Sequence, residues 1–129
     1  MKLESLDFIY MPSRDPAAEL DWFENVLGAE VVFAIERFGT RVAMVQPASG
    51  PAVLLAGHLQ GDRPILVFRV DSLEAAAKEL EATGAAVGPA FEIPHGSIRE
   101  IEAPGGHRLA IYELTRPERA QGLAGRRDW

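Results

Sequence analysis

The chain contains no cysteine among its 129 residues. This absence excludes disulfide bonds, thiolate catalysis, cysteine-based zinc sites and iron–sulfur clusters. Any metal chemistry would therefore depend on histidine, glutamate and aspartate. Histidine is also scarce, because the chain has only three, and no two of them have the i, i+4 spacing that places two imidazoles on one helix face.

Long apolar runs are missing as well. No segment approaches the length of a membrane span, and residues 1–7 lack the apolar core of a signal peptide. We therefore expect a cytoplasmic protein with no membrane partner. The formal net charge of -6 argues against a nucleic-acid partner, because phosphate binding needs a basic surface. Neutral or cationic small molecules fit this charge better.

Two motifs that mark common enzyme classes are also absent. The serines lie outside any nucleophile elbow, and no glycine-rich phosphate loop is present. These absences exclude a serine hydrolase of that type and a phosphate-loop nucleotide-binding protein.

An internal repeat organises what is present, since residues 15–29 match residues 71–85 at an offset of 56. Each segment has apolar residues at helical spacing, begins with a capping residue and ends at a glycine. We expect the following caps: Asp15 before Pro16, Asp71 paired with Glu74, and the glycines Gly28 and Gly84. The repeat therefore predicts two equivalent amphipathic helices.

Short apolar runs flank each predicted helix, and their β-branched and aromatic content predicts strands. The first copy offers Phe8–Met11, Glu30–Ile35, Arg41–Gln46 and Ala52–Ala56, and the second offers Ile65–Val70, Ala86–Phe91, Ser97–Glu102 and Arg108–Glu113. The fold class predicted is thus α+β, with two βαβββ modules, about residues 3–57 and 65–113, in a curved, antiparallel-rich sheet. We expect one domain over residues 1–114 and a polar, solvated C-terminal tail over residues 115–129.

Three stretches resemble a known family. Residues 6–10 with the helix end at residues 22–28 resemble the opening of a vicinal oxygen chelate module, the module of glyoxalases, bleomycin resistance proteins and extradiol dioxygenases. Residues 67–74 resemble the opening of its second module, and residues 103–107 occupy the place of its Asp-Pro-Asp-Gly-Asn turn. The resemblance spans about residues 3–114. It implies a mixed sheet curved around one cleft, and frequently a homodimer.

The resemblance also implies where a metal would be held. Enzymes of this family use four side chains, and the corresponding positions here are Phe8, Leu54, Ile65 and Ala110. None of these side chains carries a lone pair for a metal. A register error of one residue would add only Asp7 as a donor. We therefore expect no metal and no cofactor.

An apolar lining is predicted in place of the metal. Strand alternation puts Tyr10, Val67, Arg69 and Tyr112 on the same side as those four residues. Residues 94–101 resemble a segment near the cleft mouth of bleomycin resistance proteins, which adds His95 and Arg99. The candidate ligand-binding residues are Phe8, Tyr10, Leu54, Ile65, Val67, Arg69, His95, Arg99, Ala110 and Tyr112.

A simpler interpretation of these residues stays open. The apolar side chains could fill a closed core, His95 could be an ordinary loop residue, and the arginines could pair with surface carboxylates.

The leading functional hypothesis is a metal-free protein that binds a small hydrophobic or aromatic and possibly cationic molecule, as antibiotic-sequestering relatives do. Catalysis would then be unnecessary. The alternative is a metal-dependent lyase, isomerase or dioxygenase with a displaced site built from His58, His95, His107 and nearby carboxylates. A third possibility is a structural or regulatory dimer.

Overall fold

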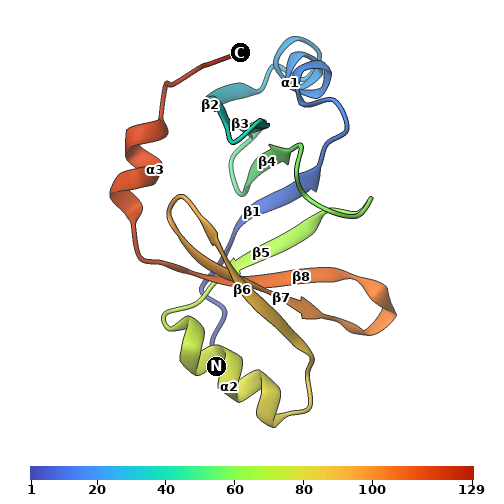
Figure 1. Ribbon diagram of the computed structural model, residues 1–129, viewed down its shortest axis with the longest axis vertical. Coiled ribbons are helices and arrows are strands. Elements are labelled where there is room, and N and C mark those ends of the chain that lie inside the picture. The colour runs from blue at the N-terminus through green and yellow to red at the C-terminus, as the bar shows by residue number, and fades with distance from the viewer. The chain divides into compact units, whose positions relative to one another are not determined.

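The computed structural model describes all residues from Met1 to Trp129. Its elements follow the order β1 (Ser5–Pro12), α1 (Pro16–Asn25), β2 (Glu30–Arg37), β3 (Thr40–Gln46), β4 (Ala52–Ala56), β5 (Ile65–Arg69), α2 (Leu73–Ala82), β6 (Val87–Ile93), β7 (Gly96–Glu102), a 3-10 turn (Pro104–Gly106), β8 (Arg108–Leu114) and α3 (Pro117–Leu123). This order confirms an α+β fold with two βαβββ modules (Figure 1). No helix combines the length and apolarity needed to cross a bilayer.

The chain divides into two compact units, which we name by their helices. The α1 unit contains residues 8–64 and 123–129, and the α2 unit contains residues 1–7 and 65–122. Each unit thus holds one module, although the first three residues of β1 belong to the α2 unit. That the two modules act as one domain stays a prediction.

The α1 unit is a four-stranded mixed sheet with one helix on one face. Its strand order is β2-β3-β4-β1, with β1 parallel to β4 and the other pairs antiparallel. Successive side chains of each strand point to opposite faces of the sheet. Leu20 of α1 packs on one face, against Val45, Val53 and Leu55. Phe8, Tyr10 and Leu54 point to the face opposite α1. All five residues of β4 are buried, as expected for a strand with neighbours on both edges.

The α2 unit repeats this arrangement. Its strand order is β5-β8-β7-β6, with β5 parallel to β8. Leu73 and Ala76 of α2 pack with Val70 and Ile111 on one face of the sheet. The pairs Val67 with Ala110 and Arg69 with Tyr112 lie side by side on the other face. Each unit therefore buries one face under its helix and turns to the other face the predicted ligand-binding positions of β1, β4, β5 and β8.

The structure confirms three of the four helix caps that the repeat predicts. Asp15 accepts a hydrogen bond from the Ala18 backbone N–H, and Gly28 and Gly84 have the positive φ of C-terminal glycines. The cap expected at Asp71 was wrong. Ser72 caps α2 by accepting from the Ala75 N–H, because it is the residue directly before the first helical turn.

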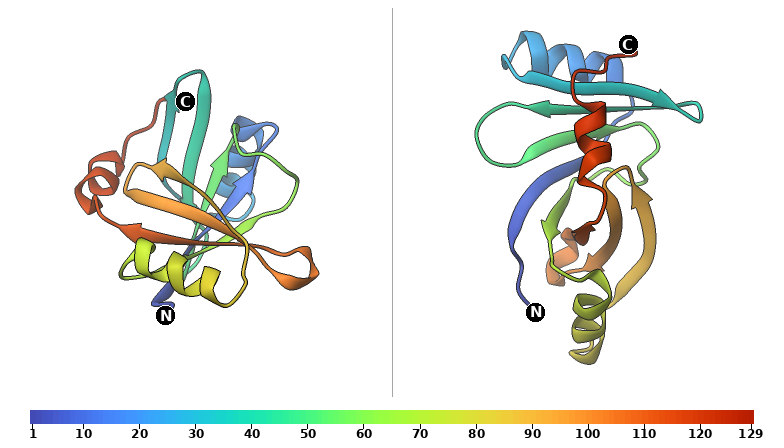
Figure 2. Two further views of the ribbon diagram at one scale, coloured as in Figure 1. Left: turned by 60° about the horizontal axis from the view of Figure 1, so that its bottom comes forward. Right: turned by 90° about the vertical axis from the view of Figure 1, so that its left-hand side faces the viewer.

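The solvated tail was also wrong for its last residues. Gly125 donates to Val32 O, Ala34 donates to Arg126 O, and Asp128 donates back to Ala34 O, so the segment runs along the outer edge of β2 (Figure 2). Trp129 donates its indole N–H to Ile35 O at 2.9 Å and packs against the α1 core. The polar composition of the segment does not indicate this contact, because the segment binds the edge of β2 through backbone hydrogen bonds that any residue type can make.

Candidate functional site

The four positions at which the sequence resemblance implies metal ligands are apolar and buried in the structure. Phe8 and Leu54 of the α1 unit are 2% and 4% exposed, and Ile65 and Ala110 of the α2 unit are fully buried. No group of three metal-binding side chains forms anywhere in the chain. Since divalent metals in such sites need imidazole or carboxylate ligands, these residues do not fit the metal.

A polar group lies at one end of the corresponding face of the α2 unit. The Tyr112 hydroxyl donates to one carboxylate oxygen of Asp7, and the Ser5 hydroxyl donates to the other. The β5–β8 pairing sets Arg69 beside Tyr112, and its Nε lies 3.5 Å from carboxylate oxygens of both Asp7 and Glu4. Asp7 thus connects a phenol, a hydroxyl and a guanidinium.

Sequence reasoning did not place Asp7 among the candidates. Asp7 appeared only as a possible metal donor one residue out of register, although it stands directly before the expected ligand position Phe8. Its partner Tyr112 is 105 residues away, so no local spacing indicates the contact. A carboxylate in an otherwise apolar strand opening was the one available signal, because such a group needs a partner when it is partly buried.

His95 joins this group from the turn between β6 and β7. Its ring meets the Tyr112 ring edge-on, with centroids 5.5 Å apart, and only 6% of the residue is exposed. Arg116 braces the turn: its backbone N–H donates to His95 O, and its guanidinium donates to Ile93 O and Gly96 O. The structure therefore brings Arg69, His95 and Tyr112 of the candidate set together.

The charge state of His95 follows from this environment. Burial lowers the pKa of the imidazole, the Asp7 carboxylate opposes this change, and the Arg116 guanidinium adds to it. The neutral imidazole is therefore favoured in the folded chain. A neutral ring can accept a hydrogen bond as well as donate one, which suits a binding surface.

We expect this burial to make stability depend on pH. The His95 pKa is lower in the folded than in the unfolded chain, so the unfolded chain binds more protons as pH falls through the unfolded value of about 6.5. The free energy of unfolding should therefore decrease between about pH 8 and about pH 5. Urea titrations across this range would show a smaller decrease for His95→Gln. The exposed His107 provides the control, and a His107→Gln variant that removes the dependence would contradict the assignment.

A second polar contact occurs in the α1 unit. The Tyr10 hydroxyl lies 3.2 Å from His58 Nε2, and His58 Nδ1 lies 3.4 Å from the Thr40 hydroxyl. Tyr10 also contacts Phe8, with ring centroids 6.3 Å apart. Burial raises the pKa of Tyr10 to about 12. Phe8 and Tyr10 thus form an aromatic pair whose only polar end meets an exposed imidazole.

Both tyrosines should resist ionisation in the folded protein. The chain has only two, and burial raises the pKa of Tyr10 to about 12 and that of Tyr112 further, with the Asp7 hydrogen bond adding to the second shift. An absorbance titration should show no phenolate near the ordinary pKa of 10.0 until the chain unfolds. Because the unfolded chain ionises first, stability should fall as pH rises above that value. A native titration step near the ordinary value would show that one ring is in water.

Arg99 and His107, which were also considered as site residues, lie away from the group around Asp7. Arg99 donates from Nε to Gly88 O at 2.7 Å and pairs with Glu81 of α2 at 3.4 Å, so it lies on the helix-covered face, opposite Tyr112. His107 is exposed and lies against Gly105. The structure does not bring either side chain to the group around Asp7.

Comparison with solved structures supports the fold. A methylmalonyl-CoA epimerase from Mycobacterium tuberculosis is 22% identical, with a TM-score of 0.66 over 86% of this chain and 88% of its own. A methylmalonyl-CoA epimerase variant from Streptomyces coelicolor in complex with 2-nitronate-propionyl-CoA is 17% identical, with a TM-score of 0.68 over 87% and 95%. A hypothetical protein from Bacillus halodurans is 14% identical, with a TM-score of 0.70 over 84% and 92%. At these identities the likeness shows the fold alone.

Sequence comparison then gives the family. No curated protein sequence matches the chain significantly. A family model described as Glyoxalase/Bleomycin resistance protein/Dioxygenase superfamily matches residues 5–111, which is most of the chain. Together with the duplicated βαβββ module, this match shows that the chain belongs to the glyoxalase/bleomycin resistance protein/dioxygenase superfamily.

Proposed function

We propose that the protein binds a small hydrophobic or aromatic molecule without the help of a metal. The observation that carries this proposal is that Phe8, Leu54, Ile65 and Ala110, at the four positions where the resemblance implies metal ligands, are buried and have no donor atom for a metal. Apolar walls with a few polar groups are the usual composition of a small-molecule site. In the α2 unit, the Tyr112 hydroxyl and the neighbouring His95 imidazole supply such polar groups.

The charge around Tyr112 favours a cationic ligand within this class. Glu4 and Asp7 bring two carboxylates against the single guanidinium of Arg69, which leaves one negative charge. The whole chain carries a net charge of -6 and adds a field of the same sign. An aromatic molecule with an amine fits both the rings and the charge. Arg99, which faces α2, is not part of this proposal.

A metal-dependent enzyme is the second candidate. The observation that favours it is the fold likeness to methylmalonyl-CoA epimerases, which are enzymes. In this alternative a displaced site would use His58, His95, His107 and nearby carboxylates. The structure contains no group of three histidine, aspartate or glutamate side chains that could hold a metal ion.

Metal analysis of the purified protein separates the two candidates. We expect less than stoichiometric divalent metal and no change in melting temperature on adding a chelator. Stoichiometric metal that disappears in His95→Ala would overturn the metal-free proposal. A melting temperature that falls with chelator would do the same.

Calorimetric titration tests the ligand class. The probes are pairs of aromatic compounds that differ only in a cationic amine or a neutral group in its place. We expect saturable binding, with Asp7→Asn weakening the cationic probe about tenfold, or about 1.4 kcal/mol, and leaving the neutral probe unchanged. Asp62→Asn, at a side chain that is 88% exposed, is the matched control. Absence of saturable binding across the panel would sink the proposal.

A further inference from the structure

A polar hollow lies at the end of β1 in the α1 unit. Its volume is about 460 Å³, within the range of about 300–1,000 Å³ that is usual for small-molecule sites. Its walls come from three segments, namely residues 12–14 after β1, Glu19 of α1 and residues of the loop 57–62. We call this space the β1–α1 hollow. None of its lining residues is among the candidate ligand-binding residues described above.

Backbone contacts hold the walls of the hollow in place. The Ser13 N–H donates to Ala56 O at 3.0 Å, which joins the end of β1 to β4. The Gly57 N–H donates to Arg41 O at 3.1 Å. A Cβ on Gly57 would lie 3.4 Å from Pro16 Cγ, so the start of the loop lies close to the first turn of α1. The walls are therefore formed by the fold of the unit itself, and a ligand need not order them.

A buried serine positions the negative charge of the hollow. Ser13 is only 5% exposed, and its hydroxyl donates to Glu19 Oε1 at 2.9 Å. Glu19 is partly buried and forms no ion pair within the chain. Its second oxygen, Oε2, is therefore available to a donor. A partly buried carboxylate that lacks a cation favours a ligand that brings one.

Arg14 supplies a positive charge to the same hollow. Its side chain is exposed and takes part in no ion pair or hydrogen bond within the chain. Arg14 and Glu19 both line the hollow but do not form a salt bridge with each other. The remaining charged residue of the lining, Asp62, is 88% exposed and lies 4.0 Å from Arg63. One hollow thus contains two opposite charges that have no charged partner.

We propose that the β1–α1 hollow binds a small molecule that carries both a carboxylate and a protonated amine. The carboxylate pairs with the Arg14 guanidinium, whose planar fork of N–H donors matches a carboxylate. The amine donates to Glu19 Oε2, the oxygen that Ser13 does not occupy. Because Arg14 and Glu19 do not reach each other, we expect a short chain between the two charged groups of the ligand, as in an ω-amino acid. This site is separate from the proposed aromatic-ligand site and does not depend on it.

Titrations of the isotope-labelled full chain, followed by NMR, test the ligand class. The probes are 4-aminobutyrate and 6-aminohexanoate, each compared with the singly charged acid and amine of the same length. We expect saturable shifts in the amide signals of residues 13–19 and 57–62 with at least one of the two amino acids. Its acid and amine analogues should bind about tenfold more weakly, because each lacks one of the two charge contacts.

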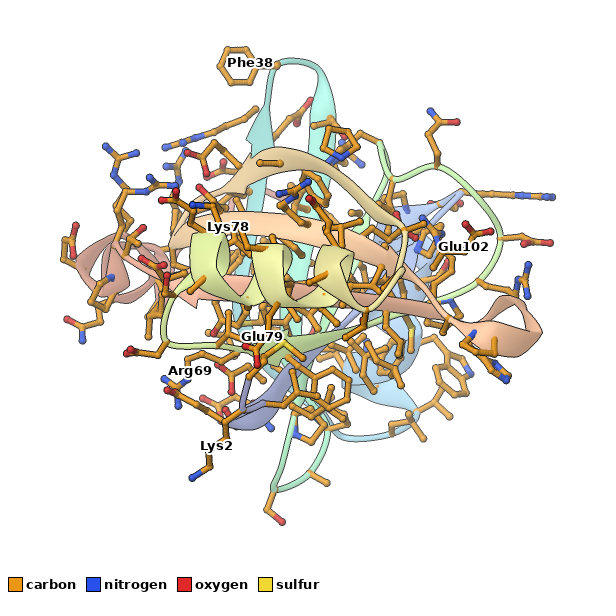
Figure 3. All side chains as sticks on the ribbon, turned by 90° about the horizontal axis from the view of Figure 1, so that it is seen from below. Lys2, Phe38, Arg69, Lys78, Glu79 and Glu102 are labelled. Carbon is orange, nitrogen blue, oxygen red and sulfur yellow. The ribbon has the colours of Figure 1, made fainter.

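Two variants test the assigned charges. Arg14→Gln and Glu19→Gln should each weaken binding of the amino acid about tenfold. Glu19→Gln keeps an acceptor for the Ser13 hydroxyl, so the fold should be retained, and circular dichroism of each variant verifies this. The matched controls are Lys2→Gln and Glu102→Gln, at exposed residues that form no ion pair, and both should leave the affinity unchanged. Figure 3 shows the Lys2 side chain extending away from the ribbon.

Three results would overturn the proposal. The first is the absence of saturable shifts with both amino acids. The second is an acid or amine analogue that binds as tightly as the amino acid of the same length, because one charge contact would then suffice. The third is an affinity that neither Arg14→Gln nor Glu19→Gln reduces.

Discussion

Replacing Gly96 by alanine is expected to prevent stable folding. A Cβ on Gly96 would lie 1.9 Å from the Glu113 carbonyl oxygen and 3.1 Å from its carbonyl carbon. Both are backbone atoms of the paired strand β8, so neither can rotate away. Relief would need β7 and β8 to separate beside the turn that holds His95. We expect a loss of about 4 kcal/mol or more, close to the whole stability of a small domain.

Gly122→Ala is the matched control. An added Cβ at this position has no heavy atom within 4 Å, and Gly122 lies in α3 without a positive φ. Alanine should leave stability unchanged or raise it by about 0.5–1 kcal/mol, because it restricts the unfolded chain and favours the helix. Urea unfolding followed by circular dichroism compares the two variants. A Gly96→Ala protein with the wild-type transition would show that the strands are further apart than described.

The second large effect is expected for Ala110→Glu, which introduces a carboxylate at one of the four positions where the resemblance implies a metal ligand. Ala110 is fully buried, and its β7 neighbour is Glu100, a group of the same charge. Ile65, the other position of the α2 unit where the resemblance implies a metal ligand, offers no donor for a metal that could compensate the new charge. The variant should lose about 3–5 kcal/mol at pH 7. Burial raises the pKa of the introduced carboxyl, so the deficit should shrink as pH falls.

Ala110→Gln has nearly the same volume without the charge and isolates the electrostatic part of this loss. It should be destabilised less than Ala110→Glu at pH 7 and should show no comparable recovery at low pH. Melting curves with and without added divalent metal complete the comparison. If metal restored the stability of Ala110→Glu, the positions around it would be metal-competent and the metal-free proposal would be contradicted.

Much of the fold could be predicted because its helices and strands have local sequence signals, and these signals occur in both copies of the repeat. Capping residues, helical apolar spacing and terminal glycines indicated α1 and α2, and β-branched runs indicated all eight strands to within a few residues. The cap of α2 was misassigned because Asp71 and Ser72 are both good capping residues, and only the backbone decides which directly precedes the helix. Helix α3 was missed because seven residues with one buried leucine carry no periodic signal.

Only those parts of the candidate site that depend on strand alternation could be predicted. Alternation is a local property, so it gave the shared faces of Phe8 with Tyr10 and of Ala110 with Tyr112. The Asp7–Tyr112 hydrogen bond depends on which distant strands approach each other. Arg99 became a candidate through the resemblance of residues 94–101, which does not say on which face of the sheet its side chain lies. The structure pairs it with Ile111, on the face packed against α2.

The C-terminal segment along β2 has a consequence for how copies of the protein can associate. An uncovered outer strand invites a neighbouring chain to add its own strand, and repetition of this addition leads to open polymers. Here Gly125, Arg126 and Asp128 already bond Val32 and Ala34, and Trp129 closes the end of the segment. The C-terminal segment of the chain thus occupies the edge of β2 and protects it from pairing with another chain. Strand addition at this edge of the α1 unit is thereby blocked, so any association of the α1 unit must use side-chain surfaces.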